Sequence, residues 1–225
     1  MSNKSLHTPR GLARFSHLTT PDQYDASSKP NYNTGLIFDP SDPEVQEFLS
    51  KLEAIHTEGV EAIKADHKKK IAEATNGAAK KKAETALKEL GIPKYLKDVE
   101  DRETGEPTGK VYLNFKTYAE DRNGNRKTIK FFDGRKQPFK LTEEPWGGSV
   151  LRVNFTPQVK EVAKKVFMTL WINAVQVLEL RNGGGSGNAD DLFGGDESDF
   201  EAPKVESFDD GVEDIQGDEA SDGDY

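Results

Sequence analysis

The chain contains no cysteine, which excludes disulfides, thiolate zinc sites, iron–sulfur clusters and cysteine nucleophiles. No stretch reaches the roughly 18 consecutive apolar residues that a membrane-spanning helix needs, so we expect no membrane partner. No apolar run follows residues 1–5, and we therefore expect no secretory signal peptide. Of the 225 residues, 34% are apolar, which is enough for one modest core.

Motifs of catalysis are also missing. The sequence has no glycine-rich phosphate loop or dinucleotide fingerprint, and no Ser–His–Asp order with a recognisable local motif. The four histidines lack the spacing of a shared metal site. A nuclease would need a cluster of carboxylates on adjacent strands, and the pattern shows none. We therefore expect that the protein is not an enzyme and that it has no cofactor and no metal site.

Acidic charge is concentrated at the C-terminal end. Residues 183–225 hold 15 Asp or Glu and a single basic residue, Lys204, for a net charge of −14. Residues 1–182 carry +5, although the whole chain carries −9. We expect a flexible linker and disordered acidic tail at 183–225, because the few apolar residues there cannot offset the entropy of ordering. Such a tail serves either solubility or interaction, as a mimic of a polyanion.

Residues 1–182 show the pattern of a mainly β domain with a helical insertion at about 41–91. Apolar residues at helical spacing predict helices there, capped by Ser41 and interrupted at 76–77. Period-two alternation predicts strands over 10–20, 32–39, 110–119, 126–133, 149–155 and 167–181. The dipeptide Asn123-Gly124 predicts a hairpin between the third and fourth of these strands. Five or six such strands favour a small barrel with an amphipathic helix packed outside.

Outward positions of these strands carry aromatic, basic and amide side chains. Single-stranded nucleic acid binds such a surface, because a base stacked on a ring contributes ~1–3 kcal/mol and cations follow the phosphates. The candidate nucleic-acid-binding residues are Tyr112, Lys116, Tyr118, Lys130, Phe132, Arg152, Asn154, Trp171 and Asn173. The alternative is that the aromatic residues among them cover helix-packing surface. The lysines at 68–70 and 80–82 form either a solvated helix face or an auxiliary phosphate contact.

Several segments, in order along the chain, resemble one known family. They are Pro21-Asp22, 36–43 (LIFDPSDP), 116–119 (KTYA), 147–155 (GGSVLRVNF), 175–180 (VQVLEL) and the acidic end, Asp-Gly-Asp plus an aromatic residue. Together they resemble the single-stranded DNA-binding proteins of short-tailed bacteriophages, which have an OB-fold core and an acidic C-terminal tail.

This resemblance implies sequence-independent binding of single-stranded DNA in replication, recombination and repair, in the cytoplasm of the infected bacterial host. It implies that the tail recruits replication proteins such as the polymerase and the helicase–primase. The residues implied in recruitment are Asp222, Asp224 and Tyr225, where a tyrosine replaces the phenylalanine of the best-known relative. Members of the family are often homodimers, with the tail lying in the partner's groove.

The charge difference adds a hypothesis about regulation. A tail of −14 tethered to a body of +5 has a high effective concentration near any basic groove. We expect it to compete there with DNA and to be released for partners when DNA binds. The alternative function is an acidic-tailed adaptor or chaperone that holds basic proteins.

Overall fold

The structure is a computed structural model that describes residues 4–23, 25–101, 103–121 and 123–181. The expected tail at 183–225, including Asp222, Asp224 and Tyr225, lies outside the described residues. The described part is mainly β, with two helices, α1 (Pro43–Glu73) and α2 (Gly77–Lys88). Its strands are β1 (Leu6–His7), β2 (Gly11–Asp22), β3 (Asn31–Phe38), β4 (Lys97–Glu100), β5 (Pro107–Tyr118), β6 (Lys130–Phe132), β7 (Pro138–Phe139), β8 (Val150–Val162) and β9 (Lys165–Glu179).

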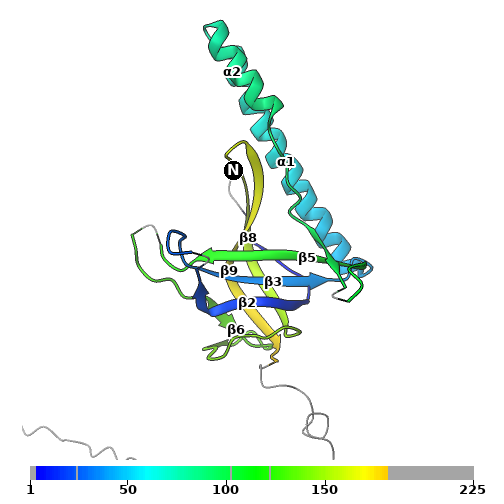
Figure 1. Ribbon diagram of the computed structural model, residues 1–225. Helices are drawn as coiled ribbons and strands as arrows, with labels where there is room; N and C mark the ends of the chain where they lie inside the picture. Colours follow the sequence, from blue (N-terminus) through cyan, green and yellow to red (C-terminus); the bar gives the residue numbers. More distant parts are fainter. Residues whose placement is uncertain (1–3, 24, 102, 122, 182–225) are drawn as a thin grey trace, which may run out of the picture. The chain divides into compact units, whose positions relative to one another are not determined.

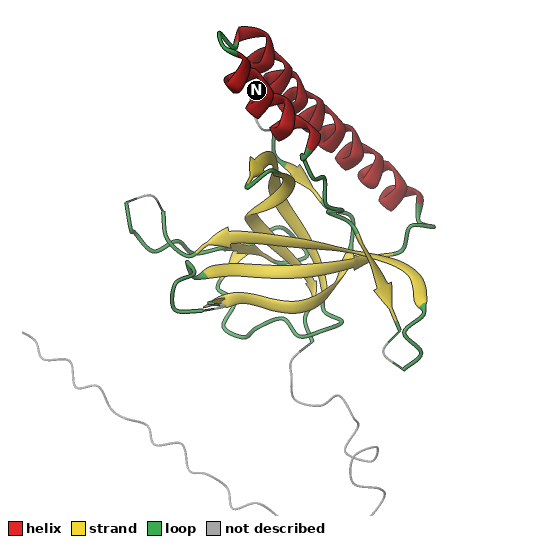
Figure 2. Cartoon of the chain, turned by 45° about the horizontal axis from the view of Figure 1, so that its top comes forward, coloured by secondary structure: helices red, strands yellow, loops and turns green. Residues whose placement is uncertain are grey.

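Five of these strands close into a ring, which Figures 1 and 2 show beneath the helices. β2 pairs with β3, β3 with β5, β5 with β9, β9 with β8, and β8 pairs again with β2. Only the β5–β9 pair is parallel, and the other four are antiparallel. The remaining strands extend this sheet: β1 along β8, β4 along β5, and β6 with β7 along β9.

The core fills the inside of the ring and continues under α1. The inward positions that alternation predicts on β5 and β8 are confirmed, since Leu113, Phe115, Leu151, Val153 and Phe155 are fully buried. From α1, Phe48 packs its ring 5.7 Å from Phe38 and 6.1 Å from Phe155, measured between centroids. Burial of this apolar stripe holds the helix on the ring, because an isolated amphipathic helix is only marginally stable.

The start of α1 differs from the prediction by one residue. The N-cap is Asp42, whose carboxylate accepts a 2.8 Å hydrogen bond from the backbone N–H of Glu44. Ser41 does not cap the helix, because its hydroxyl donates to Asp39 at 2.6 Å. Proline begins the helix at position 43, where its missing N–H costs nothing. The predicted interruption at 76–77 is confirmed, with α1 ending at Glu73 and α2 starting at Gly77.

Beyond the core, α1 lies against a hairpin formed by the distal halves of β8 and β9. The helix approaches closely at Gly59, where an added Cβ would lie 2.5 Å from Cβ of Val159. Farther along, His67 Nε2 and Glu161 Oε2 are 2.7 Å apart. The chain after α2 is hydrogen-bonded to the hairpin tip, with Gly91 N–H donating to the Lys164 carbonyl at 2.9 Å. In the described residues, neither helix is both long and apolar enough to cross a bilayer.

The β8–β9 hairpin is longer than the sequence pattern predicts. β8 continues past residue 155 to Val162, and β9 begins at Lys165. The turn residues Ala163 and Lys164 both have positive φ, the combination found in a type I′ turn. Because neither is Gly, Asn or Asp, the usual sequence signature of this turn is absent.

The predicted hairpin between 110–119 and 126–133 is confirmed only next to its turn. Gly124 lies in a turn with positive φ, Glu120 and Arg126 form an antiparallel bridge, and the Lys127 N–H donates to the Ala119 carbonyl at 2.7 Å. In the described residues the pairing of these two segments extends no farther. β5 and the short β6 instead follow one another along the same edge of β9, both parallel to it. The buried Phe131 lies opposite Val175 there, so packing against β9 decides where β6 pairs.

Candidate nucleic-acid interface

The strand register places one row of side chains across the outside of the ring. In the order of their strands β2, β3, β5 and β9, paired side by side, they are His17, Asn33, Lys116 and Trp171. Phe115 and Leu170, which precede the last two, are buried, so alternation turns Lys116 and Trp171 outward. We call these four residues the outer row. Long-range strand pairing thus brings two of the predicted binding residues together with two that were not predicted.

An aromatic pair lies at the β9 end of the outer row. The rings of Tyr118 and Trp171 are 5.1 Å apart between centroids and inclined by 45°. Tyr118 is 44% exposed, and Lys29 Nζ lies 6.0 Å from the centre of its ring. The Trp171 indole donates a 3.1 Å hydrogen bond to Gln158 Oε1, which fixes the orientation of the ring. The pair offers aromatic surface next to cations, as base stacking requires.

Charges of both signs border this pair. Tyr118 and Trp171 line a hollow of about 320 Å³ together with Lys29, Lys160, Glu120 and Asp121, among others. A hydrogen bond from the Asn125 side chain lowers the pKa of Asp121 from its ordinary value, so this carboxylate stays charged at neutral pH. The carboxylates repel phosphate and the lysines attract it. A bound polynucleotide backbone is therefore expected on the lysine side of the hollow.

The predicted residues Asn154 and Asn173 lie beside Trp171 because of a β-bulge. The β8–β9 register passes from Asn154 opposite Ala174 to Phe155 opposite Ile172, which leaves Asn173 as the extra residue. Its amide donates at 3.0 Å to both Asn154 Oδ1 and Thr156 Oγ1. The bulge also inverts the alternation beyond it.

Tyr112 lies farther along β5 and covers Gly35 on β3. A Cβ at Gly35 would overlap the Tyr112 ring, so glycine is what allows the ring to lie against the strand here. The guanidinium carbon of Arg14 is 5.8 Å from the centre of this ring. Burial raises the pKa of the Tyr112 hydroxyl, which stays neutral near pH 7. Tyr112 is thus partly a packing residue, as the alternative interpretation of the aromatics holds.

Three predicted residues lie away from the aromatic pair. Arg152 is next to the start of α1, where its guanidinium lies 3.3 Å from the Glu44 carboxylate, so the structure does not place it with Lys116. Lys130 on β6 lies opposite Ala174 on β9. Ala174 lies opposite Asn154 on β8, so these three residues form a row separate from the outer row. Phe132 is half-buried opposite Gln176. A single groove holding all nine predicted residues is therefore not what the structure shows.

Comparison with known proteins identifies solved structures of similar fold. No protein-family model and no curated protein sequence matches the chain. Among solved structures, gp2.5, a single-stranded DNA-binding protein encoded by bacteriophage T7, matches with a TM-score of 0.56 and 18% identity, over 89% of this chain and 98% of the other. The single-stranded DNA-binding protein from bacteriophage Enc34, solved in complex with single-stranded DNA, matches with a TM-score of 0.50 and 14% identity, over 80% and 89%.

The chain shares its fold with bacteriophage single-stranded DNA-binding proteins. The resemblance inferred from the ordered segments is confirmed at this level. Both matching proteins are described as single-stranded DNA-binding proteins. In the part of this chain that the structure describes, no three His, Asp or Glu side chains come together as a metal site would require.

Sequence reasoning missed several residues of the surface. Lys29 lies in the loop before β3, and Arg14 and His17 lie on β2, whose alternation is weak. Their positions follow from the pairing of β2 with β3 and of β3 with β5. Lys160 and Gln158 lie on the part of β8 that was not predicted as strand. A local pattern finds side chains that share a strand face, but only the pairing shows which strands are neighbours.

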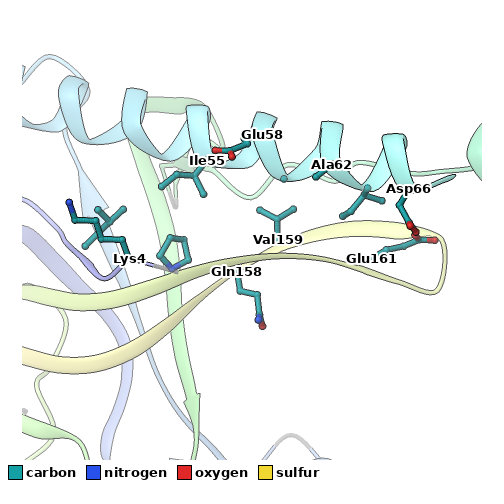
Figure 3. Close-up of a pocket in the computed structure, with 12 residues that line it drawn as sticks. Lys4, Ile55, Glu58, Ala62, Asp66, Gln158, Val159 and Glu161 are labelled. Atoms are coloured by element: carbon teal, nitrogen blue, oxygen red, sulfur yellow. The ribbon is translucent and has the colours of Figure 1, made fainter. Parts of the chain in front are cut away.

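A second hollow lies on the other face of the β8–β9 hairpin. It measures about 780 Å³ and lies between the hairpin and α1 (Figure 3). Figure 3 shows Val159 pointing toward α1 and Gln158 pointing away from it. Because Gln158 bonds Trp171, the helices and the aromatic pair are on opposite faces of the hairpin. The carboxylates of Glu58, Asp66 and Glu161 line this hollow, which makes it a poor site for phosphate.

The lysine clusters at 68–70 and 80–82 are exposed on α1 and α2. Two of these lysines are engaged with carboxylates of their own helix, since Lys70 lies 2.5 Å from Asp66 and Lys69 lies 3.8 Å from Glu73. These clusters therefore belong to the helix side of the hairpin and not to the outer row.

Proposed function

We propose that the chain binds single-stranded DNA without sequence preference on the outer row and the adjoining aromatic pair. The observation that carries the proposal is the pair formed by the exposed Tyr118 and the half-buried Trp171, with Lys29 and Lys116 beside it. Every base has a π-face, so stacking on these rings tolerates any sequence, while the lysines contact the phosphates. The fold shared with bacteriophage single-stranded DNA-binding proteins supports this function.

In this proposal the ring of β-strands is an OB-fold, and the single-stranded DNA crosses its outer face. The row runs nearly perpendicular to the strands, over β9, β5, β3 and β2. The amides of Asn154 and Asn173 supply hydrogen-bonding groups beside the stacked bases. Affinity then comes mainly from phosphate charge and stacking, which do not depend on base identity.

The proposed setting is replication and recombination of phage DNA inside the infected bacterium. There the protein covers unwound DNA, and the acidic tail at 183–225, ending in Asp222, Asp224 and Tyr225, recruits the polymerase and the helicase–primase. The tail also competes with DNA for the outer row, since its charge of −14 gives a tethered polyanion. DNA binding then releases the tail for its partners without a change of shape in the body. Homodimer formation stays a prediction.

The test is fluorescence anisotropy with a labelled single-stranded oligonucleotide of mixed sequence and the matching duplex. The full chain is compared with a chain truncated after residue 182. We expect the single strand to bind far more tightly than the duplex, and the truncation to raise its affinity. Equal affinity for both DNA forms would contradict the proposal, and binding of basic proteins instead of DNA would favour the adaptor. Unchanged affinity on truncation would leave recruitment as the tail's role.

A further inference from the structure

A second pair of exposed aromatic residues lies at the opposite end of the outer row. Phe15 is 61% exposed and Trp146 is 57% exposed. Both line a hollow of about 580 Å³, together with Arg14 and the outer-row residue His17, among others. The hollow therefore continues the proposed DNA-binding surface past β2.

The backbone at Phe15 is strained. Arg14 lies opposite Gly35 and His17 lies opposite Asn33, so three steps on β2 match two on β3 and one residue is extra. That bulge contains Phe15, whose φ is +52°, a region that favours glycine and is unusual for a bulky residue. Its neighbour Ser16 turns inward and bonds Thr34 at 2.7 Å. A strained, exposed aromatic contributes little to the core, which points to a role outside folding.

Trp146 is presented by a segment that is hydrogen-bonded to β2 on both sides of the bulge. On one side the Glu144 carboxylate accepts from the backbone N–H groups of Leu18 at 2.8 Å and Thr19 at 2.6 Å. On the other side the Gly148 N–H donates to the Ala13 carbonyl at 3.0 Å. The backbone that carries Trp146 is therefore held next to the bulge. The Glu144 carboxylate keeps its negative charge, so the phosphates of a bound strand are expected on the Arg14 side of the hollow.

Arg14 joins this aromatic pair to the rest of the surface. Its guanidinium carbon lies 4.8 Å from the centre of the Phe15 ring and 5.8 Å from that of Tyr112. Arg14 lies opposite Gly35 on β3, one outward position along β2 from His17. A cation beside the exposed Phe15 ring and the half-buried Tyr112 ring, continuous with the outer row, suits a polynucleotide better than an apolar protein segment.

We propose that Phe15 and Trp146 form a second stacking site for the same single strand, with Arg14 contacting its phosphates. The inference rests on the proposed function and extends it. The single-stranded DNA lies over Tyr118 and Trp171 and crosses β5 and β3. Its bases stack again where it passes β2. The binding footprint is then longer than the first aromatic pair alone can cover.

The two tryptophans of the chain, Trp146 and Trp171, allow each end to be observed separately. In Trp171→Phe the only indole is Trp146, and in Trp146→Phe it is Trp171. Each variant is titrated with a single-stranded oligonucleotide while indole fluorescence is recorded, and anisotropy of a labelled oligonucleotide measures binding independently. We expect quenching in both variants. Binding of Trp171→Phe without quenching would overturn the second site and leave the proposed function standing, whereas absence of binding in both variants and in the unaltered chain would refute the proposed function.

The substitution Phe15→Gly provides a test that keeps both tryptophans. Phe15→Gly relieves the positive φ, so the midpoint of thermal unfolding should rise or stay unchanged. Affinity for an oligonucleotide of about 16 nucleotides should fall by about 5- to 150-fold, the loss of one stacked base. An unaltered affinity for this oligonucleotide, with the fold intact, would overturn the inference.

Discussion

Replacing Trp171 with alanine should weaken binding of single-stranded DNA by about 5- to 150-fold, because a stacked base contributes ~1–3 kcal/mol. The indole is the partner of Tyr118 at 5.1 Å and is oriented by Gln158 at 3.1 Å. Its removal takes away one stacking surface and leaves the Tyr118 ring without its neighbour. The loss should be seen with oligonucleotides of any sequence, measured by anisotropy at fixed salt.

Trp171→Phe is the matched control for this loss. It keeps a ring at the same place and removes only the hydrogen bond to Gln158, so most of the affinity should remain. Thermal unfolding followed by circular dichroism checks that both variants are folded. Equal binding by Trp171→Ala and the unaltered chain would mean that the aromatic pair is a packing feature, as the alternative interpretation of the exposed aromatics supposes.

Salt should weaken binding still more strongly. If Arg14, Lys29, Lys116 and Lys160 each neutralise one phosphate, the slope of log affinity against log salt is about −2.8, at ~0.7 per contact on a single strand. A tenfold rise in salt then lowers affinity by roughly 600-fold. The truncated chain is the better protein for this measurement, because the acidic tail adds its own salt dependence in the full chain.

Single lysine variants locate the contacts that produce the slope. Lys116→Ala should reduce its magnitude by about 0.7. Lys81→Ala is the control, since Lys81 is exposed on α2, on the helix side of the hairpin. A slope that responds to Lys81 and not to Lys116 would place the phosphates on the helices and contradict the outer row.

The sequence was most informative where alternation is regular and local. On β5 and β8 it separates the buried Phe115 and Phe155 from the outward Lys116 and Asn154, and both assignments agree with the structure. The helical insertion and its interruption before Gly77 also follow from local spacing. These features depend on residues two to four positions apart, which a sequence pattern records directly.

Features that depend on distant pairing were missed. The parallel β5–β9 contact places Trp171 beside Lys116, across more than fifty residues of chain, and no local pattern indicates it. The bulges at Phe15 and Asn173 change the alternation by one residue each, without a glycine at either position. Arg152 alternates outward as predicted, but the ion pair with Glu44 depends on where α1 begins in space.

Photochemical crosslinking tests the central claim, that the outer row and the Tyr118–Trp171 pair form the DNA-binding surface, most directly. A single strand carrying bromodeoxyuridine is irradiated with the full chain, and the crosslinked residues are identified by mass spectrometry. We predict crosslinks at Tyr118 and Trp171, which a competing unlabelled single strand removes and an equal amount of duplex does not. Crosslinks confined to α1 and α2, with none on β5 or β9, would contradict the account.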